Sequence, residues 1–284
     1  MTGKVFDNSV SPQWCPGCPN FGILSAYKKA LTAMNKKPRD VCVVSGIGQA
    51  AKLPHYLQCH FFNGLHGRAL PAAQGIVAAN PQLTVLVATG DGDCYGEGGN
   101  HFIHAVRRNP DLTVIVHNNQ LYALTKGQAS PTTPLGKKMN LPQRGVEASP
   151  LNMLGIAVIN GCGFVARGFA GAIDHLAGLI KGGVEHKGLA VIEVIQPCIT
   201  WGDKPVKWYR DRVDVLENHD VENREKALEL TLSGERIPVG ILYREPEKPV
   251  FGEKFRKTIF SGPLFSMPLD VAETTQKALN AFRG

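Results

Sequence analysis

The sequence predicts an α/β fold in which helices cover both faces of a mainly parallel sheet. Apolar runs of buried-strand length alternate with helical stretches from about residue 41 to residue 197, and this alternation is typical of βαβ units. Two of the runs end in turn-forming polar residues, Gly-Asp-Gly-Asp at 90–93 and the Asn pair at 118–119. Both ends therefore point to the carboxyl edge of the sheet, where open α/β sheets bind ligands.

The first half of the chain divides into elements by the length and polarity of its apolar runs. Short runs rich in Val, Ile and Leu that stop at Gly or polar residues are expected to be strands, and longer stretches of mixed polarity are expected to be helices. Residues 1–20 are rich in Pro and Cys, and no regular structure is expected there. In chain order we expect a helix over 23–34, strand over 41–45, helix over 70–79, strand over 83–89, helix over 98–108 and strand over 112–117.

A long connection over 120–150 follows, with many Gly, Pro and polar residues. Loops of this length inside a compact domain are usually functional. Beyond it we expect a helix over 168–181, a strand over 190–195, a helix over 220–232 and a strand over 237–243.

Composition shifts predict three segments. Residues 1–20 hold a Cys-x₂-Cys turn, residues 21–198 form the α/β domain, and residues 199–284 are polar and aromatic with little periodicity near the end. We expect the last segment to be a C-terminal arm that packs on a partner subunit. A tail packed on its own domain is the alternative.

Length and charge limit the classes of function. The chain has 284 residues and a formal net charge of +7, but its basic residues are dispersed and no nucleic-acid recognition motif accompanies them. Anionic cofactors or an acidic protein partner, such as an electron carrier, account for the charge equally well. We expect no nucleic acid, no membrane span and no signal peptide, and hence a cytoplasmic protein.

The polar ends of two strands form an expected diphosphate and metal cradle. Asp91 offers a carboxylate oxygen, Asn119 an amide oxygen and Leu121 a backbone carbonyl, and oxygen ligands suit Mg²⁺ beside phosphates. Gly90 and Gly92 lack side chains, so backbone N–H groups can approach a diphosphate closely. This strand, Gly-Asp-Gly, helix, strand and Asn-Asn order resembles the thiamine diphosphate signature, although a Gly-Asp-Gly alone is more often an ordinary turn.

The cysteines suggest a second inorganic site. The chain has seven cysteines, and an odd number favours metal or redox use over a disulfide framework. Cys15 and Cys18 lie in Trp-Cys-Pro-Gly-Cys, and Cys198 follows an expected strand. Zinc knuckles, redox dithiols and iron–sulfur sites all use Cys-x₂-Cys, so a structural zinc site remains an alternative here.

Several motifs in a fixed order resemble one family, the β subunits of 2-oxoacid:ferredoxin oxidoreductases. The resemblance covers roughly residues 12–205. The motifs are Trp-Cys-Pro-Gly-Cys at 14–18, Ser-Gly-Ile-Gly at 45–48, Leu-His-Gly-Arg-Ala at 65–69, Gly-Asp-Gly-Asp at 90–93, Asn-His at 100–101, Arg-Arg-Asn at 107–109, Asn-Asn at 118–119, Leu-Thr-Lys-Gly-Gln at 124–128, Ser-Pro-Thr at 130–132 and Gln-Pro-Cys at 196–198.

The resemblance implies a thiamine diphosphate-binding fold that carries thiamine diphosphate, Mg²⁺ and a [4Fe–4S] cluster. It implies Asp91, Asn119 and the Leu121 carbonyl as Mg²⁺ ligands, with Gly90, Gly92, Asp93, His66 and Gly67 also at the cofactor. Cys15, Cys18 and Cys198 are then three cluster ligands. Family members commonly have a Cys directly after Ser-Gly-Ile-Gly, whereas this chain has Gln49. A [4Fe–4S] cluster normally has four protein ligands, and our candidate for the fourth is Cys59.

The resemblance also implies an activity. The expected reaction is the coenzyme A-dependent, reversible oxidative decarboxylation of 2-oxoglutarate to succinyl-CoA, with electrons passed to ferredoxin. Lys126, and with less weight Lys52, are expected to face the far carboxylate of the substrate. Pyruvate or another 2-oxoacid is the alternative substrate, and a non-catalytic scaffold with a metal knuckle is the alternative function.

The expected assembly needs a second chain. No carboxylate suited to activating the aminopyrimidine of the cofactor is evident in this sequence. We therefore expect it on an α subunit, or a fused α/γ subunit, and we expect this chain to be inactive alone. A dimer of αβ units is the expected assembly.

Overall fold

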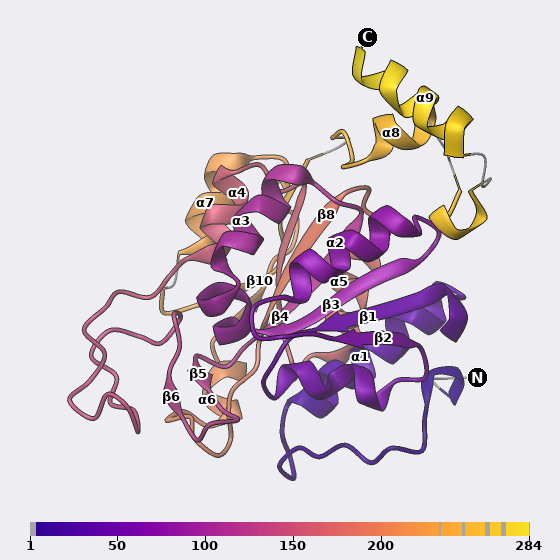
Figure 1. The fold of residues 1–284 in the computed structure, drawn as a ribbon. Coiled ribbons are helices and arrows are strands. Elements are labelled where there is room, and N and C mark those ends of the chain that lie inside the picture. Colours follow the sequence, from indigo (N-terminus) through magenta and orange to yellow (C-terminus); the bar gives the residue numbers. More distant parts are fainter. Residues whose placement is uncertain (1–3, 233, 246–247, 259–261, 268–270, 284) are drawn as a thin grey trace.

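The computed structural model describes residues 4–232, 234–245, 248–258, 262–267 and 271–283. These residues form a single main sheet of eight strands in the order β2-β1-β3-β4-β8-β7-β10-β9 (Figure 1). All neighbouring strands run parallel except β7 and β10, which are antiparallel. The expected mainly parallel α/β fold is thus confirmed.

Three central strands are apolar along their length because both of their faces are covered. They are β3 (Thr84–Gly90), β4 (Leu112–Asn118) and β8 (Leu189–Ile195), and they are almost entirely buried. Parallel strands covered on both faces read as continuous runs of Val, Ile and Leu instead of alternating ones. β1 (Val41–Ser45) is buried in the same way, and all four strands match the sequence prediction within one residue at either end.

Two apolar clusters lie on the two faces of the sheet. One holds the buried sides of α2 (Ala69–Ala79), α3 (Gly99–Arg108) and α4 (Met153–Ile159). The other holds those of α1 (Asn20–Ala33) and α5 (Ile173–Glu185). This two-sided arrangement, visible in Figure 1, buries the sheet from water and leaves its carboxyl edge for ligands.

The predicted helix over 168–181 was placed too early. Residues Phe164–Phe169 instead form β7, which pairs with β8 and β10, and the helix α5 begins at Ile173. The strand was missed because a buried Arg167 interrupts its apolar run. Its guanidinium donates to the backbone oxygens of Leu230 and Thr231 and lies 3.7 Å from Glu193, so the charge is compensated inside the fold.

Other elements were not predicted because they are short or exposed. β2 (His60–Asn63) is an exposed edge strand, and α4 has only seven residues. The remaining short elements are η1 (Lys4–Phe6), η2 (Pro38–Asp40), η3 (Ala50–Tyr56), η4 (Gly92–Glu97), β5 (Leu121–Tyr122), β6 (Gln128–Ala129), α6 (Val206–Arg210) and β9 (Val213–Val215).

The segment after residue 198 divides into two parts. Its first part is integrated into the domain, because β10 (Ile237–Arg244) extends the main sheet and α7 (Arg224–Thr231) contacts α4. The second part contains α8 (Glu253–Thr258), η5 (Leu264–Ser266) and α9 (Val271–Arg283). α8 and α9 stand away from the sheet, at the upper right in Figure 1.

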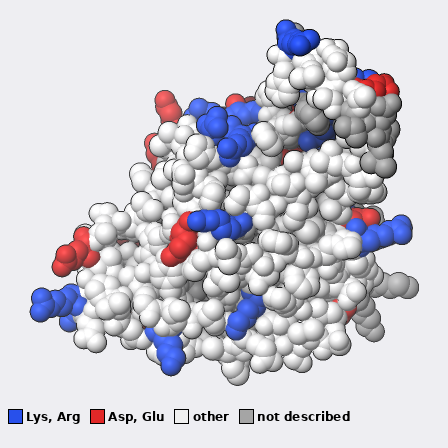
Figure 2. All heavy atoms as spheres, viewed as in Figure 1, with Lys and Arg blue, Asp and Glu red and all other residues white. Residues whose placement is uncertain are grey.

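Charged side chains are scattered over the visible face of the molecule, with broad uncharged areas between them (Figure 2). They form no continuous basic stripe on this face, which agrees with the dispersed basic residues of the sequence. Among the helices that the structure describes, none is long and apolar enough to span a membrane.

Candidate cofactor and cluster site

The sheet brings the two predicted polar strand ends together. β3 and β4 are parallel neighbours, and Gly90 at the end of β3 pairs with His117 near the end of β4. Asp91 directly follows β3, and Asn119 directly follows β4. The two residues therefore lie at the same edge, as the sequence predicted from the parallel arrangement.

Asp91 is a buried carboxylate held by hydroxyl groups. Its Oδ2 accepts hydrogen bonds from Ser130 Oγ at 2.5 Å and Thr132 Oγ1 at 2.6 Å. Burial raises the pKa of Asp91 to about 6, although these hydroxyls oppose the shift. Across the part of the chain that the structure describes, no Lys, Arg or His forms an ion pair with it. A buried carboxylate without a cationic partner is costly, so the site fits a cation.

Asn119 begins a tight turn that leads into the long loop. Its Oδ1 accepts the backbone N–H of Leu121 at 3.1 Å, and Leu121 is buried. The turn places the side-chain amide of Asn119 and the backbone of Leu121 next to each other, beyond the end of β4. Carboxylate, amide and carbonyl oxygens from Asp91, Asn119 and Leu121 are a donor set that suits Mg²⁺.

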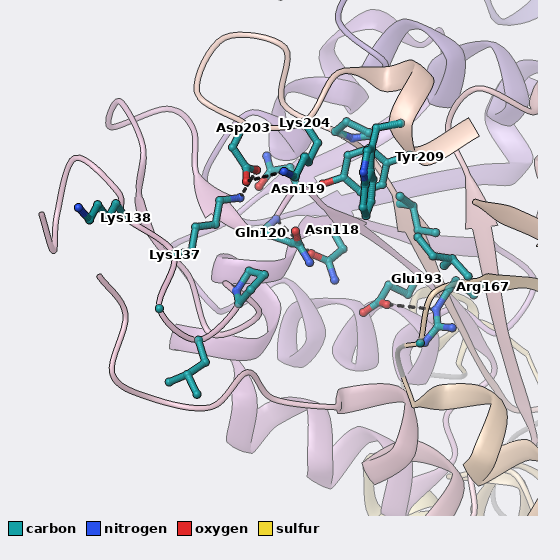
Figure 3. A pocket seen from close by; sticks show the side chains of 18 residues that line it. Asn118, Asn119, Gln120, Lys137, Lys138, Arg167, Glu193, Asp203, Lys204 and Tyr209 are labelled. Carbon is teal, nitrogen blue, oxygen red and sulfur yellow. Dashed lines mark hydrogen bonds and ion pairs between the residues drawn. The ribbon is translucent and has the colours of Figure 1, made fainter. Parts of the chain in front are cut away.

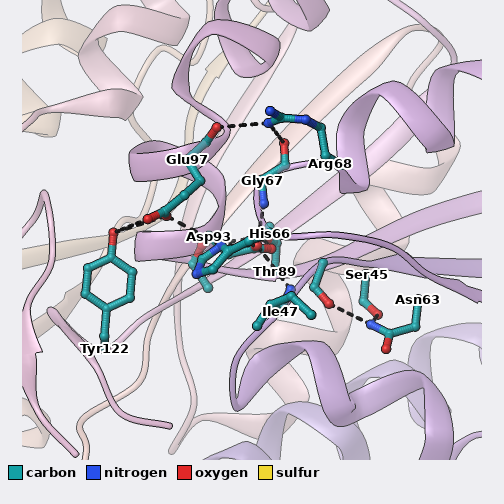
Figure 4. A network of polar contacts seen from close by, with 12 residues as sticks. Ser45, Ile47, Asn63, His66, Gly67, Arg68, Thr89, Asp93, Glu97 and Tyr122 are labelled. Atoms are coloured by element: carbon teal, nitrogen blue, oxygen red, sulfur yellow. Dashed lines mark hydrogen bonds and ion pairs between the residues drawn. The ribbon is translucent and has the colours of Figure 1, made fainter. Parts of the chain in front are cut away.

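Asp93 joins two loops to the end of β3 by hydrogen bonds (Figure 4). Its buried carboxylate accepts hydrogen bonds from Ile47 N at 3.1 Å, Gly67 N at 2.8 Å and Thr89 Oγ1 at 2.6 Å. These donors come from the loops after β1 and β2 and from β3 itself. Asp93 therefore fixes the walls of the site, and its two carboxylate oxygens are already engaged by the protein.

His66 lies beside this carboxylate. Its Nδ1 is 2.8 Å from Asp93 Oδ1 and 3.5 Å from Glu97 Oε2. Glu97 in turn accepts the Tyr122 hydroxyl at 3.1 Å, and Figure 4 shows the three side chains in one group. The imidazole is thus oriented by two carboxylates, and about a third of its surface remains exposed.

Glycines are required where the loops approach each other. A Cβ on Gly67, where φ is +71°, would lie 2.4 Å from the carbonyl carbon of Glu97. A Cβ on Gly92 would lie 2.3 Å from Cε1 of Tyr122. At Gly92 the close neighbour is thus an aromatic ring, and Gly90 has no such close neighbour. The approach of these two glycines to a diphosphate stays a prediction.

A cavity of about 710 Å³ lies at the carboxyl ends of β4 and β8 (Figure 3). Its volume is in the range of small-molecule and cofactor sites. Figure 3 shows ion pairs on two of its sides, Lys137 with Asp203 at 2.9 Å and Arg167 with Glu193 at 3.7 Å. Asn119 also lines this cavity, so one predicted metal ligand faces a space of cofactor size.

Three predicted cluster ligands line a second, small cavity of about 40 Å³. Cys15 and Cys18 come from the segment before α1, and Cys198 follows β8. Burial, with the neighbouring Cys198 and Cys15, raises the pKa of the Cys18 thiol to about 11. Thiols that oppose each other's ionisation in this way fit a site where positive iron compensates the thiolates.

Each of these three sulfur atoms accepts one hydrogen bond. Thr200 Oγ1 donates to Cys15 at 3.3 Å, Gln196 Nε2 to Cys18 at 3.8 Å and the backbone N–H of Trp201 to Cys198 at 3.4 Å. Donors directed at sulfur are a usual means of tuning iron–sulfur clusters.

No three His, Cys, Asp or Glu side chains within the described ranges are arranged to hold one metal ion. This result concerns sites in which those four residue types bind one metal ion. In a cubane cluster each ligand binds a different iron, so the ligands stand farther apart. Two of the three expected Mg²⁺ donors, from Asn119 and Leu121, are amide or carbonyl oxygens and do not belong to those residue types.

Cys59 does not line the cavity of the other three cysteines. It packs against the core on the α1 side, where burial and the nearby Cys42 raise the pKa of its thiol to about 12. Gln49 occupies the cavity wall instead. The structure therefore brings together Cys15, Cys18 and Cys198 and leaves Cys59 elsewhere.

The two predicted substrate lysines lie in different surroundings. Lys126 is exposed on the long loop, with φ at +78°, and its carbonyl accepts from the Asn140 side chain. Lys52 lies in η3, and its ammonium contacts the Gln13 carbonyl at 3.4 Å. Lys52 thus ties the N-terminal segment to η3. Lys126 lines neither cavity, although Ala123 of the same loop lines the cysteine cavity.

Several site residues carried no assigned role in the sequence. Ser130 and Thr132 cover Asp91, and Thr200 and Trp201 donate to cysteine sulfur. The Ser-Pro-Thr spacing at 130–132 was the available signal, since Pro131 fixes the turn that presents both hydroxyls on one side. The donors after Cys198 had no comparable signal.

The chain is similar to known proteins of one family. The family described as thiamine pyrophosphate enzyme, C-terminal TPP binding domain, matches residues 42–194, and the C-terminal family of the pyruvate ferredoxin oxidoreductase beta subunit matches residues 198–259. Among curated relatives, 2-oxoacid:ferredoxin oxidoreductase 1, subunit beta, of Aeropyrum pernix is 41% identical over 264 residues, which cover 88% of this chain and 83% of that protein. The 2-oxoglutarate synthase subunit KorB of Methanocaldococcus jannaschii is 39% identical, with 87% and 92% covered.

A solved structure has the same fold over nearly its whole length. It is a 2-oxoglutarate:ferredoxin oxidoreductase from Magnetococcus marinus with 2-oxoglutarate, coenzyme A and succinyl-CoA bound. The TM-score is 0.90 and the identity 33%, with 98% of this chain and 96% of that chain covered.

Proposed function

This chain belongs to the β subunits of the 2-oxoacid:ferredoxin oxidoreductases, and we propose that it binds thiamine diphosphate for the coenzyme A-dependent, reversible oxidative decarboxylation of 2-oxoglutarate. The products are succinyl-CoA and CO₂, and the electrons leave through a [4Fe–4S] cluster to ferredoxin. The activity requires an α subunit, or a fused α/γ subunit, and the working assembly is a dimer of αβ units.

One observation carries the proposal. Asn119 lines both the large cavity at the carboxyl edge and the small cavity that holds Cys15, Cys18 and Cys198. A cofactor that occupies the large cavity and contacts Asn119 would therefore be separated from a cluster on the cysteines by that one residue. A structural zinc knuckle gives no reason for a cofactor cradle to share a wall with the cysteines.

In this proposal the residues of the chain bind the cofactor and fix its orientation. When bound, thiamine diphosphate would supply the carbanion chemistry that the decarboxylation of a 2-oxoacid needs. Asp91, Asn119 and the Leu121 carbonyl would hold Mg²⁺. Asp93 would hold His66 in place beside the cofactor and join the two flanking loops by hydrogen bonds.

We favour 2-oxoglutarate over pyruvate as the substrate because of the positive charge of a loop lysine. Lys126 extends from the loop beside the site, and an ammonium there would pair with the second carboxylate that pyruvate lacks. Relatives named for 2-oxoglutarate and relatives named for 2-oxoacids in general both match this chain, so the loop lysine is the discriminating feature.

The Asp91→Asn variant tests the cofactor site. We expect the anaerobically purified complex with its α subunit to lose at least about a hundredfold in thiamine diphosphate affinity, because the charged Mg²⁺ ligand is gone. Thiamine diphosphate per chain after gel filtration in Mg²⁺ buffer measures this. Asp174→Asn, at an 86% exposed side chain, is the matched control, and equal cofactor content in both variants would contradict the assignment.

The Lys126→Met variant tests the substrate. Loss of a charged hydrogen bond to a carboxylate costs about 1.5–3 kcal/mol, so the ratio of kcat/KM for 2-oxoglutarate to that for pyruvate should fall about tenfold to hundredfold. Lys187→Met, at a lysine whose side chain is 80% exposed and which does not line the large cavity, should leave the ratio unchanged. An unchanged ratio in Lys126→Met would remove the lysine from substrate selection without affecting the cofactor assignment.

A further inference from the structure

The small cavity contains a buried oxygen atom without a partner. Gln49 lines this cavity with Cys15, Cys18 and Cys198, and its side-chain oxygen Oε1 is inaccessible to water and has no hydrogen-bond partner among the described residues. An unpaired buried amide oxygen costs about 1–3 kcal/mol. Native structures seldom leave such an atom unpaired unless a ligand, ion or water completes it.

Gln49 is held in place from the cysteine segment. Its backbone carbonyl accepts a hydrogen bond from Trp14 Nε1 at 2.9 Å, and Trp14 directly precedes Cys15. The Trp14 ring is itself fixed by edge contacts with Phe21 and Tyr56. The backbone of Gln49, which directly precedes η3, is therefore held against the Cys-x₂-Cys turn.

Other polar groups at this cavity already have hydrogen-bond partners. The three sulfur atoms each accept one hydrogen bond, from Thr200, Gln196 and Trp201. Asn20 Oδ1 pairs with His117 Nδ1 at 2.8 Å. Among the buried side-chain oxygens of the residues that line this cavity, Gln49 Oε1 is the one that the described residues leave without a hydrogen-bond partner.

We propose that Gln49 Oε1 is the fourth protein ligand of the cluster, so that three irons are held by thiolates and one by an amide oxygen. This inference rests on the proposed function, since it presumes that a [4Fe–4S] cluster occupies the cysteine cavity. It replaces Cys59 in that role, because Cys59 lies outside the cavity. An oxygen-bound iron is chemically distinct from its three neighbours and is held less firmly than a thiolate-bound one.

The test uses Mössbauer spectroscopy on the ⁵⁷Fe-labelled, anaerobically purified complex of this chain with its α subunit. We expect about one quarter of the iron signal, one of four irons, to form a separate component. In Gln49→Cys this component should merge with the other three. In Gln49→Ala mild oxidation should release one iron per cluster and leave the EPR signal of a three-iron cluster.

Two further variants keep the test interpretable. Gln49→Glu retains an oxygen ligand of the same length, so its separate iron component should persist even where Gln49→Ala fails to assemble. Cys59→Ser should leave the spectrum as in the unsubstituted chain. Four equivalent irons in the unsubstituted complex, or loss of one iron in Cys59→Ser alone, would overturn the assignment of Gln49 and leave the proposed function intact. Absence of iron, or zinc in its place, would overturn the cluster itself.

Discussion

The two aspartates of the Gly-Asp-Gly-Asp motif have different roles. Asp91 accepts only hydroxyl donors and has no ion pair among the described side chains, whereas Asp93 accepts two backbone N–H groups and the Thr89 hydroxyl and contacts His66. Their spacing of two residues gives no hint of this division. We infer that Asp91 is kept for a cation and that Asp93 keeps the site in shape.

This difference predicts opposite effects on stability in the protein without cofactor. Burial raises the pKa of Asp91 from 3.8 to about 6, so its ionisation opposes folding as pH rises through that window and costs roughly 2–3 kcal/mol above it. Asp91→Asn removes the charge and should therefore unfold at a temperature equal to or above that of the unsubstituted chain at pH 8. Thermal unfolding followed by circular dichroism measures this.

Asp93→Asn should behave in the opposite way. It weakens charge-assisted hydrogen bonds to buried donors, and we expect a loss of about 2–4 kcal/mol in the free energy of unfolding. A loss in Asp91→Asn as large as that in Asp93→Asn would show that both carboxylates are structural.

His117 predicts a pH dependence of stability. It is buried, its Nδ1 contacts Asn20 Oδ1, and burial lowers its pKa to about 3. The unfolded chain takes up a proton near pH 6.5 and the folded chain does not, so stability falls as pH drops below 6.5, by about 1.4 kcal/mol per pH unit. Between pH 6.5 and 5, His117→Gln should lose about 2 kcal/mol less than the unsubstituted chain in urea titrations. His60→Gln, at an exposed position, should not differ from the unsubstituted chain.

At the scale of elements, the loop after β2 depends on one glycine. Gly67 has φ at +71°, and a Cβ there would overlap the backbone of Glu97. Gly67→Ala should therefore displace the loop that carries His66 and cost several kcal/mol. Gly75→Ala is the matched control, because Gly75 lies inside α2 with open space around it, and it should add about 0.5–1 kcal/mol of stability. Urea unfolding of both variants gives the comparison, and similar destabilisation in the two would contradict the steric argument.

Elements were predictable from sequence where one local rule governed them. The central strands are buried on both faces, so a run of Val, Ile and Leu suffices to identify them. β7 was missed because Arg167 is buried by partners more than sixty residues away, at Leu230 and Thr231. β2 was missed because it has only four residues, all exposed, and its two Phe are adjacent instead of alternating with polar residues.

The site residues likewise divide into those that a local rule predicts and those that depend on contacts between distant parts of the chain. Strand order alone was enough to predict that Asp91 and Asn119 lie at one edge, and the Cys-x₂-Cys spacing was enough to pair Cys15 with Cys18. The hydroxyls of Ser130 and Thr132, and the direction of the Gln49 side chain, depend on how distant loops fold over that edge. Sequence spacing does not contain that information, and Cys59 was favoured for lack of it.

At the scale of the whole molecule, the C-terminal part predicts where a partner binds. Phe265 is 84% exposed and Phe282 is 88% exposed, and the helices of this part stand away from the sheet (Figure 1). The double variant Phe265→Ser, Phe282→Ser should weaken association with the α subunit by at least tenfold, because each buried aromatic ring contributes about 1.5–3 kcal/mol. Unfolding of the isolated chain should not change.

Analytical ultracentrifugation of the mixed subunits measures this association. Ile159→Ser, at a 64% exposed position on the sheet domain, serves as the control. Equal association in the double variant and the control would place the partner elsewhere on the molecule.

Because Asn119 lines two cavities, it constrains how this protein can evolve. One side chain lies between the large cavity and the cysteine cavity, so a replacement that suits one of them must also be tolerated by the other. The two sites cannot drift independently, and a lineage that loses one is released from keeping this residue for the other. Chains of this architecture that lack the cysteines are where a different residue at position 119 should first be found.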